Sequence, residues 1–353
     1  MAAGSVGRAA SKAVTRDDVA RYAGVSSAVV SYVVNDGPRP VAAATAARVR
    51  EAIDLLGYRP NAAARALKVG SSRLLALVVP DSSNPFFAEF ALEIEKVATE
   101  RGLALLVANS NADTAFEARL LADLAARQVD GLIVSGAAGP PPHGGGSRSP
   151  TPTVYIDCAL PVPGRHTLGS DAFDGARQAV EHLLVVHDHH SVALVIGTGA
   201  GSTTDQREAG WQQALEDADR PPGPVVRVPF TRNGGYLAGL RLFRSRPLPD
   251  AVFASNDIQA VGLMRAAHEL GIQVPNEVAV VAFDCTQESE YSWPPLTSAR
   301  QPVKEMAEAA VRTVLDTTRP PSHQVFPMDL VIRRSCGCAN TAPTSTRKAR
   351  KRS

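Results

Sequence analysis

The fold is decided near the N-terminus, where residues 15–37 read TRDDVARYAGVSSAVVSYVVNDG. Thr15 and Asp18 have the spacing of a capping box, so we expect a helix to begin there and to run to about Tyr22. Gly24 then supplies a turn before a second run of helix-compatible residues. The stretch therefore predicts two short helices joined by a tight turn.

The second helix is expected to follow Ser26, which has the right side chain for an N-cap. Helical spacing predicts a buried stripe that consists of Val29, Val30, Val33 and Val34. The opposite face would then carry small or hydrogen-bonding, uncharged residues, namely Ser27, Ala28, Ser31 and Tyr32. Such a face can lie against base edges in a major groove, although a helical hairpin with a solvated face would have the same pattern.

A third helix is predicted from Thr45 to about Leu56, with Gly57 as its C-cap. The sequence YRPNAAARALKVGSSR follows at residues 58–73. Asn61 could cap one more short helix over residues 62–68, which at that length is too weak to persist alone. We therefore expect this helix to form only when something holds it.

After Arg73 the sequence alternates between apolar strands and amphipathic helices. This alternation predicts an α/β body with doubly wound parallel sheets arranged as two lobes. The expected strands are at 74–80, 103–110, 131–135, 153–157, 192–197, 225–230, 251–256 and 278–284. The expected helices are at 86–101, 114–128, 173–187, 202–218, 234–246 and 258–270.

Composition places the 353-residue chain among globular proteins, with 44% hydrophobic and 20% charged residues. The charge is uneven: residues 1–70 hold 10 Lys and Arg against 5 Asp and Glu, residues 333–353 hold 7 against none, and the rest hold 20 against 30. Basic ends indicate a polyanionic partner. No run of 18 apolar residues and no apolar N-terminal signal are found, so we expect no membrane association and a cytoplasmic, nucleoid-associated protein.

Four segments together resemble the lactose-repressor (LacI/GalR) family of bacterial transcription regulators: DVARYAGVSSAVVSYVVN, GPRPV, LGYRPNAAARAL and VVPDSSNPFF. The resemblance extends from Thr15 to about Arg334. It implies a three-helix helix-turn-helix head (15–58), a hinge helix (59–70) and a two-lobed periplasmic-binding-protein-like body (71–334), between disordered tails (1–14 and 335–353). It further implies chain crossings between the lobes near 160–167, 291–298 and 322–327.

The same resemblance implies a homodimeric repressor that binds double-stranded DNA at a near-palindromic operator. Leu67 matches the leucine that wedges into the minor groove, and Ser27, Ala28 and Tyr32 match base-reading positions. Many relatives carry Arg at the position of Tyr32, so the half-site should differ from the common one. The full set of expected DNA contacts is Thr15, Ser26, Ser27, Ala28, Ser31, Tyr32, Asn35, Arg59, Asn61, Arg65 and Leu67; for each Arg, a solvated helix surface is the alternative.

The body is expected to bind a small-molecule effector, a sugar or sugar derivative, in the cleft between the lobes. The residues at strand ends and helix starts that match effector-binding positions are Asp81, Asn84, Phe86, Asp157, Arg207, Asn256, Asp284 and Gln301. A guanidinium, carboxylates and amides suit vicinal hydroxyls, whereas Asn and Asp at such places can also simply cap helices. We expect Asp257 to be a cap, and Cys285 stands where relatives usually have a second Asp.

We expect no metal site, no cofactor and no catalytic residues. His187, His189 and His190 are too close in sequence to face one ion together, and Cys336 and Cys338 are closer than the usual CxxC pair. Motifs for hydrolases, metalloproteases and nucleotide-binding loops are not found, and GTGAG at 197–201 is only a fragment of a dinucleotide loop. The alternatives are a solute-binding or sugar-metabolising protein and a DNA binder whose body only dimerises.

Two further segments have biased composition. Residues 139–152, GPPPHGGGSRSPTP, are expected to form a surface loop. The basic end TSTRKARKRS is expected either to add phosphate contacts or to be a solubilising tail. Since no leucine heptad follows Arg334, we do not expect a tetramer held by a terminal coiled coil.

Overall fold

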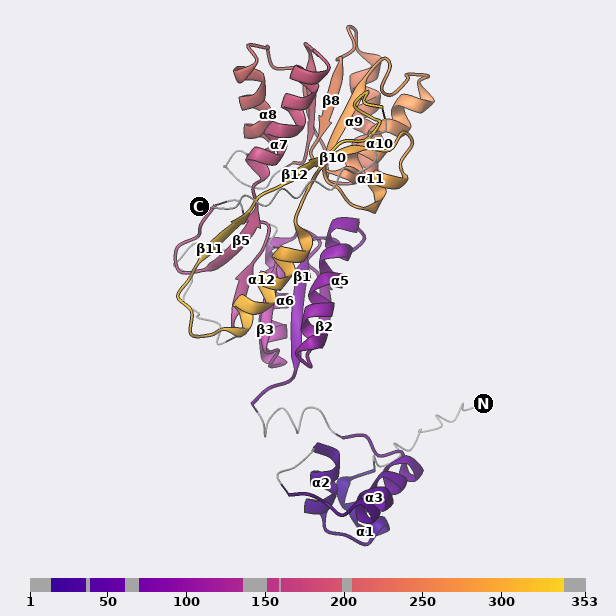
Figure 1. The fold of residues 1–353 in the computed structure, drawn as a ribbon, viewed down its shortest axis with the longest axis vertical. Coiled ribbons are helices and arrows are strands. Elements are labelled where there is room, and N and C mark those ends of the chain that lie inside the picture. The colour runs from indigo at the N-terminus through magenta and orange to yellow at the C-terminus, as the bar shows by residue number, and fades with distance from the viewer. Residues whose placement is uncertain are drawn as a thin grey trace, which may run out of the picture. The chain divides into compact units, whose positions relative to one another are not determined.

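The computed structural model describes residues 14–35, 39–60, 70–135, 151–158, 160–198 and 205–339 (Figure 1). The chain divides into two compact units, residues 1–72 and 73–353. The expectations for the hinge helix and for most of the 139–152 loop and both tails lie outside the described residues. The expectation that a disordered tail begins at residue 335 is wrong. Residues 335–339 are described, and Ser335 is buried and hydrogen-bonded to Thr297 and Val280 of the second unit.

The first unit contains three helices: α1 (Arg16–Ala23), α2 (Ser27–Asn35) and α3 (Ala43–Leu56). The predicted capping box is confirmed, because Asp18 N donates to Thr15 Oγ1 at 3.4 Å and Thr15 N donates to Asp18 Oδ2 at 2.9 Å. Gly24 ends α1 in the left-handed region, at φ 63°, where glycine carries no Cβ penalty. This turn sets the direction in which α2 leaves α1.

The valine stripe of α2 is confirmed for three of its four members. Val30 is fully buried, and Val33 and Val34 pack against the same core, which includes Val19 and Val49. Val29 is only half-buried and is not part of that core. The third helix begins two residues before the predicted start and ends at Gly57, as predicted.

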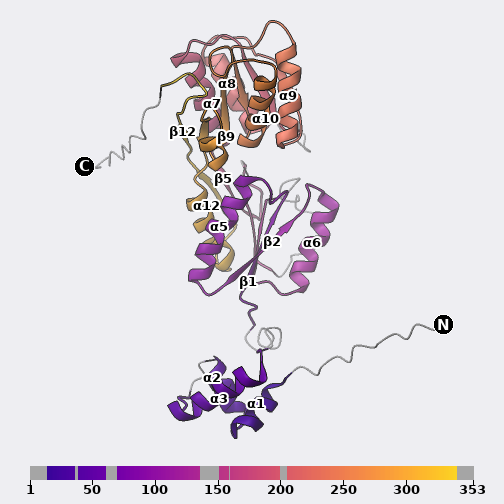
Figure 2. The same cartoon turned by 90° about the vertical axis from the view of Figure 1, so that its right-hand side faces the viewer.

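The first lobe of the second unit is a six-stranded parallel sheet in the order β11-β5-β4-β3-β1-β2. Alternate residues of β1 point to opposite faces: Leu75 and Leu77 contact the core of α5 and α12, while Ala76 and Val78 contact that of α6. Helices α5 and α12 lie on one side of the sheet and α6 on the other (Figure 2). The elements are β1 (Leu74–Val79), α5 (Pro85–Glu100), β2 (Ala104–Asn109), α6 (Thr114–Ala126), β3 (Gly131–Val134), β4 (Thr153–Tyr155), β5 (His166–Ser170), α12 (Val303–Leu315) and β11 (His323–Phe326).

The second lobe has the sheet order β12-β10-β9-β8-β6-β7, in which only β12 is antiparallel to its neighbour. One face packs against α7 and α8, and the other against α9 and α10. The elements are α7 (Ala172–Glu181), the π-helix η1 (His182–Val186), β6 (Val192–Ile196), α8 (Gln206–Asp217), β7 (Val225–Arg227), α9 (Arg232–Arg244), β8 (Ala251–Ala254), α10 (Asp257–Glu269), β9 (Ala279–Asp284), α11 (Gln287–Tyr291), β10 (Thr297–Arg300) and β12 (Asp329–Val331).

Two of the three expected lobe crossings are wrong. The first lies at Asp171, between β5 and α7, and not at 160–167; the second lies at Gln301–Pro302, between β10 and α12, and not at 291–298. The third, at 327–328, overlaps the expected segment. The errors have one cause: the strand sequences HTLGS and TSAR have no apolar run, and their burial comes from strands on both sides.

Glycines allow α9 and α10 to pack with their backbones close together. A Cβ on Gly262 would lie 1.9 Å from Arg232 O, and a Cβ on Gly235 would lie 1.9 Å from Gln259 O. Real Cβ atoms do not approach a carbonyl oxygen so closely, so any side chain at these positions would push the helices apart.

We expect Gly262→Ala to lower the free energy of unfolding by about 1–3 kcal/mol, because the added methyl must displace the backbone of α9. Urea unfolding followed by circular dichroism measures this change. Arg244→Ala, an exposed change on α9, is the control and should stay within about 0.5 kcal/mol of wild type. Equal midpoints for Gly262→Ala and wild type would contradict the close-packing argument.

Candidate functional site

Arg207, in the first turn of α8, is held by a carboxylate fork. Its Nε donates to Asp205 Oδ1 at 2.9 Å and its Nη2 donates to Asp205 Oδ2 at 2.6 Å, while its Nη1 donates to Ser255 O at 3.0 Å. The same Asp205 caps α8 by accepting from Arg207 N at 2.9 Å. A bidentate pair of this kind fixes the orientation of the guanidinium plane.

Two aromatic rings flank the guanidinium of Arg207. The ring centroids of Phe230 and Phe283 lie 4.9 and 5.5 Å from Arg207 Cζ. Phe230 is 36% exposed and occupies the space beside Gly197, where a Cβ would lie 2.0 Å from its ring. Burial by itself would lower the pKa of Arg207, but Asp205, and then Asp157 and Asp284, raise it, so the side chain keeps its charge.

A hydrogen-bond chain joins the ends of strands from both lobes. Ser170 Oγ, at the end of β5, donates to Gln301 Oε1 at 2.8 Å, and Gln301 Nε2 donates to Asp284 Oδ1 at 2.8 Å. Asp284 ends β9 with φ 99°, and Cys285 follows with φ 58°. Two successive non-glycine residues with positive φ are strained, and such strain is concentrated at functional sites. Burial raises the pKa of Asp284 well above its ordinary value.

The structure shows that the helix cap is Asn256, which was expected to contact the effector, and not Asp257. Asn256 is the N-cap of α10, and its Oδ1 accepts from Gln259 N at 2.9 Å. The expectation that Asp257 is a cap is therefore wrong. Asp257 is 1% exposed, and its carboxylate accepts from Thr286 N, Thr286 Oγ1 and Ser298 Oγ at 2.6, 2.9 and 2.7 Å. It supports the strained turn that follows Asp284.

The residues of the first lobe that were expected to bind the effector differ in their exposure to solvent. Asp81 and Asp157 are exposed at the ends of β1 and β4, whereas Phe86 is 4% exposed and packs on Phe90 in the core. Asn84 is half-buried and caps α5 by accepting from Phe86 N at 3.1 Å. The structure thus places Asp157 within electrostatic reach of Arg207 and places Phe86 beneath the surface.

The two lobes are also hydrogen-bonded to each other at a second place. Gln287 N, at the start of α11 in the second lobe, donates to Glu89 Oε1 of α5 in the first lobe at 2.9 Å. With the Ser170–Gln301 bond, this shows that the carboxyl ends of the two sheets face one another. A cavity of about 940 Å³ lies elsewhere in the second lobe, and none of the expected effector residues lines it.

Several residues of this cleft were not expected from the sequence. Asp205, Phe230 and Ser170 all contact an expected site residue. Asp205 could have been found from the DQR sequence, because an Asp just before a helix is a strong N-cap and lies near the Arg two residues on. Phe230 and Ser170 carried no such signal, since each reaches the cleft from a distant strand end.

In the head, the expected DNA-binding residues of α2 lie on its open side. Ser26, Ala28 and Asn35 are exposed, while Ser27, Ser31 and Tyr32 are half-buried. Asn35 Nδ2 donates to Ser31 O at 3.0 Å, so that side chain is turned back on its own helix. Thr15 and Arg59 are exposed; Asn61, Arg65 and Leu67 lie outside the described residues.

Comparison with known proteins identifies a DNA-binding head and a ligand-binding-type body in the chain. The sequence pattern of the family described as bacterial regulatory proteins, lacI family, matches residues 15–61, and that of the periplasmic binding protein-like domain matches residues 180–336. The HTH-type transcriptional regulator DegA of Bacillus subtilis (strain 168) is 33% identical over 336 residues, which cover 92% of this chain and 98% of DegA. The ribose operon repressor of Escherichia coli (strain K12) is 34% identical over 316 residues, 88% of this chain and 94% of that repressor.

Solved structures match over more than nine tenths of the chain. The lac repressor dimer bound to operator and the anti-inducer ONPF matches with a TM-score of 0.79 and 27% identity, covering 92% of this chain and 99% of that one. The complex of the transcriptional regulator CelR with cellobiose matches with a TM-score of 0.66 and 28% identity, covering 91% and 99%. The chain belongs to the LacI family of bacterial regulatory proteins.

Proposed function

We propose that the protein is a ligand-responsive transcription repressor that binds a near-palindromic operator as a dimer and senses a sugar-like effector between its lobes. The observation that supports it most is the fork of Asp205 on Arg207, set at a join where strand ends of both lobes meet, in a chain with a LacI-type head. A head that reads DNA and a body that binds a small ligand are the two parts such a regulator needs.

The charges of the cleft favour a neutral polyol as the effector. Asp205 already neutralises Arg207, and Asp157 and Asp284 lie close enough to Arg207 to raise its pKa. An anionic ligand would therefore find the positive charge of Arg207 already paired with Asp205. The donors and acceptors of these side chains suit vicinal hydroxyls, and the partly exposed ring of Phe230 suits the apolar face of a sugar. A relative of similar fold is named for its complex with cellobiose.

The hydrogen bonds at the join provide a route from ligand to DNA. A ligand that bridges Arg207 in the second lobe and Asp157 in the first favours one relative position of the lobes over another. Ser170 and Gln301 stand at two of the three chain crossings, so a change in lobe position must pass through them. The ligand can shift the DNA-binding equilibrium only by its difference in affinity for the two positions.

The edge of each sheet offers an apolar face for a second copy of the chain. In the first lobe, the edge strand β2 exposes Leu106 and Val107, and α5 beside it exposes Leu92. In the second lobe, the edge strand β7 exposes Val225, and α9 exposes Leu237. One head covers half of a palindrome, so two copies paired along this edge would supply both halves.

The proposal includes a place of action at the chromosome. Within the part of the chain that the structure describes, no helix has the length and apolar character needed to cross a membrane. We infer that the protein works in the cytoplasm, on the nucleoid, where its operator lies.

The test of the whole proposal is selection of bound duplexes from a random DNA pool by the purified full-length protein. We expect a near-palindrome with a flexible pyrimidine–purine step at its centre. Because Tyr32 replaces the Arg of many relatives, the half-site should differ from their common one. Recovery of no motif, both without added ligand and in the presence of a panel of pentoses, hexoses and disaccharides, would overturn the proposal.

Leu67→Ala should weaken binding to the selected operator roughly 10- to 1000-fold, because the minor-groove wedge that opens the central step is lost. Fluorescence anisotropy with labelled operator measures the affinity. Leu55→Ala, at an exposed position on α3, serves as the control and should bind like wild type. Wild-type affinity of Leu67→Ala would refute the assigned wedge.

Arg207→Ala should weaken the effector response about 10- to 100-fold while operator affinity stays the same, because hydrogen bonds from a charged donor are lost. The effector is first taken from the sugar panel as the compound that raises the melting temperature, and operator release is then titrated. Arg265→Ala, which removes an exposed ion pair with Glu269 on α10, is the matched control. An unchanged titration midpoint in Arg207→Ala would mean that the cleft is wrongly placed.

Leu106→Asp should convert the dimer to a monomer, because a carboxylate on the β2 edge cannot be buried against its copy. Sedimentation velocity measures the mass, and circular dichroism checks the fold. The opposite edge strand of the same sheet supplies the control, Val325→Asp on β11, which should leave the dimer intact. If Val325→Asp dissociates the dimer and Leu106→Asp does not, the interface lies on the other edge.

A further inference from the structure

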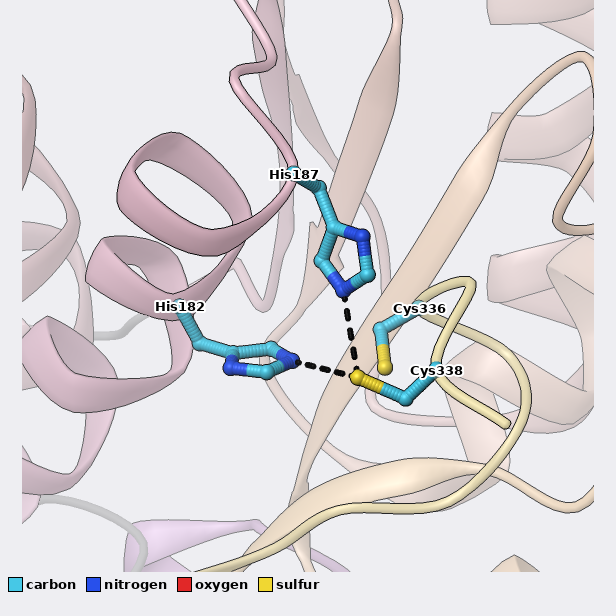
Figure 3. A group of neighbouring side chains, drawn as sticks. All are labelled: His182, His187, Cys336 and Cys338. Atoms are coloured by element: carbon cyan, nitrogen blue, oxygen red, sulfur yellow. Dashed lines mark hydrogen bonds between the residues drawn. The ribbon is translucent and has the colours of Figure 1, made fainter. Parts of the chain in front are cut away.

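Two pairs of side chains from distant parts of the sequence converge in the second lobe: His182 and His187, and Cys336 and Cys338 (Figure 3). Each offers one ligand atom, and these atoms all lie within 4.8 Å of one another. Cys338 Sγ lies 3.5 Å from His182 Nε2 and 3.3 Å from His187 Nε2. The two rings are nearly perpendicular, with centroids 5.0 Å apart, so each presents its nitrogen edge to the same sulfur.

The helical side of this cluster depends on the π-helix η1, which runs from His182 to Val186 and is followed by His187. In a regular α-helix, residues five apart are rotated by about 140° and face different directions. A π-turn closes with i→i+5 hydrogen bonds, which brings residues five apart onto one side. The π-turn therefore explains how both histidines face the same point. Such turns occur frequently at functional sites.

The cysteine side depends on the glycine between Cys336 and Cys338. Gly337 has φ 105°, a conformation that side-chain-bearing residues rarely adopt, and a Cβ there would lie 3.3 Å from two ring atoms of His187. The tight turn at Gly337 lets both sulfurs face the histidines although only one residue separates them. Glycine is required here both for the turn and for the close approach of the ring.

The segment before the cysteines is fixed by the strands beneath it. Ser335 Oγ donates to Val280 O at 2.6 Å and accepts from Thr297 N at 2.8 Å, and Val280 N donates to Ser335 O at 2.8 Å. Thr297 Oγ1 donates to Cys336 Sγ at 3.1 Å. Ser335 is fully buried and Cys336 is 1% exposed, so the thiol position is set by the fold itself. The ligand atoms are thus held in place before any ion arrives.

We propose that His182, His187, Cys336 and Cys338 form a structural zinc site that fastens the C-terminal segment to the end of α7. Zinc prefers four nitrogen and sulfur ligands in a tetrahedron, and closed sites of two Cys and two His are among its structural sites. With bond lengths of about 2.05 Å to nitrogen and about 2.3 Å to sulfur, a tetrahedron has sulfur–nitrogen edges of about 3.6 Å. The two observed separations, 3.3 and 3.5 Å, are close to that edge. Binding releases the two thiol protons to solvent.

The geometry favours a single bound metal ion over an iron–sulfur cluster or a disulfide. In a two-iron cluster with two His and two Cys ligands, the histidines bind one iron and the cysteines bind the other. Here Cys338 Sγ contacts both histidine nitrogens, which is the arrangement around a single centre. A disulfide between Cys336 and Cys338 would leave the two histidines pointing at it without a role.

The site lies away from the effector cleft. Ser335 is hydrogen-bonded to Val280, near the amino end of β9, whereas Asp284 is the last residue of that strand. The zinc would therefore hold the amino ends of the second sheet while the carboxyl ends respond to ligand. The proposal departs from the expectation of no metal drawn from the sequence, because His182 stands outside the histidine run at 187–190.

Metal analysis of the full-length protein, purified without chelators or an affinity tag that binds metal, tests the site. We expect about one zinc ion per chain in wild type, and loss of the zinc in Cys338→Ser and in His187→Ala. Cys285→Ser and His190→Ala, a cysteine and an exposed histidine outside the cluster, are the controls and should keep it. Zinc removal should lower the melting temperature of wild type by roughly 5–10 °C.

A second measurement keeps the proposal testable if the variants do not fold. Cobalt(II) added to zinc-free wild type should give the visible absorption of a tetrahedral thiolate complex, and added zinc should abolish it. No bound metal together with no cobalt spectrum would overturn the proposal. So would iron with acid-labile sulfide, or a Cys336–Cys338 disulfide found by mass spectrometry in freshly purified protein.

Discussion

Gln301 accepts a hydrogen bond from Ser170 and donates one to Asp284, and this chain of three side chains depends on how the polypeptide passes between its lobes. Ser170 ends β5, just before the first crossing, and Gln301 begins the second crossing. All three residues are at most 7% exposed. Buried polar groups must keep their partners, so the two lobes cannot separate at this point without a cost in free energy. The position of the cleft follows from this constraint.

Around that join the chain uses acidic groups to hold a single arginine. Asp205 fixes the guanidinium by two hydrogen bonds, and Arg207 Cζ lies over the rings of Phe230 and Phe283. Asp257, buried and bonded to Thr286 and Ser298, supports the turn after β9 from behind. The position of the Arg207 guanidinium is thus fixed by neighbouring side chains and not by Arg207 alone.

The two ends of the second sheet are held by different contacts. At the carboxyl ends, the strained residues Asp284 and Cys285 lie beside the hydrogen bonds that join this lobe to the first lobe. At the amino ends, Ser335 ties the C-terminal segment to β9 and β10, and the cluster that includes His187 and Cys338 ties the same segment to the end of α7. A regulator that moves at one end of a lobe needs the rest of that lobe to stay rigid.

The sequence by itself determined the elements with strong local signals. The capping box at Thr15, the turn at Gly24 and the long apolar strands were all predicted, because each depends on residues within a few positions of one another. The family resemblance placed Arg207 and Asp284 in one site, and the structure brings them within electrostatic reach of each other.

Only the tertiary structure decided what depends on distant partners. The strands at His166–Ser170 and Thr297–Arg300 carry no apolar run and are buried by their neighbours, so the crossings were misplaced. Asp257 supports the turn after β9 because it is hydrogen-bonded to Thr286 and Ser298. His182 contacts Cys338, which is 156 positions away in the sequence. Local sequence patterns predict structure that depends on interactions between residues close in sequence. A cleft or a cluster of metal ligands forms only where the packing of whole elements brings distant side chains together.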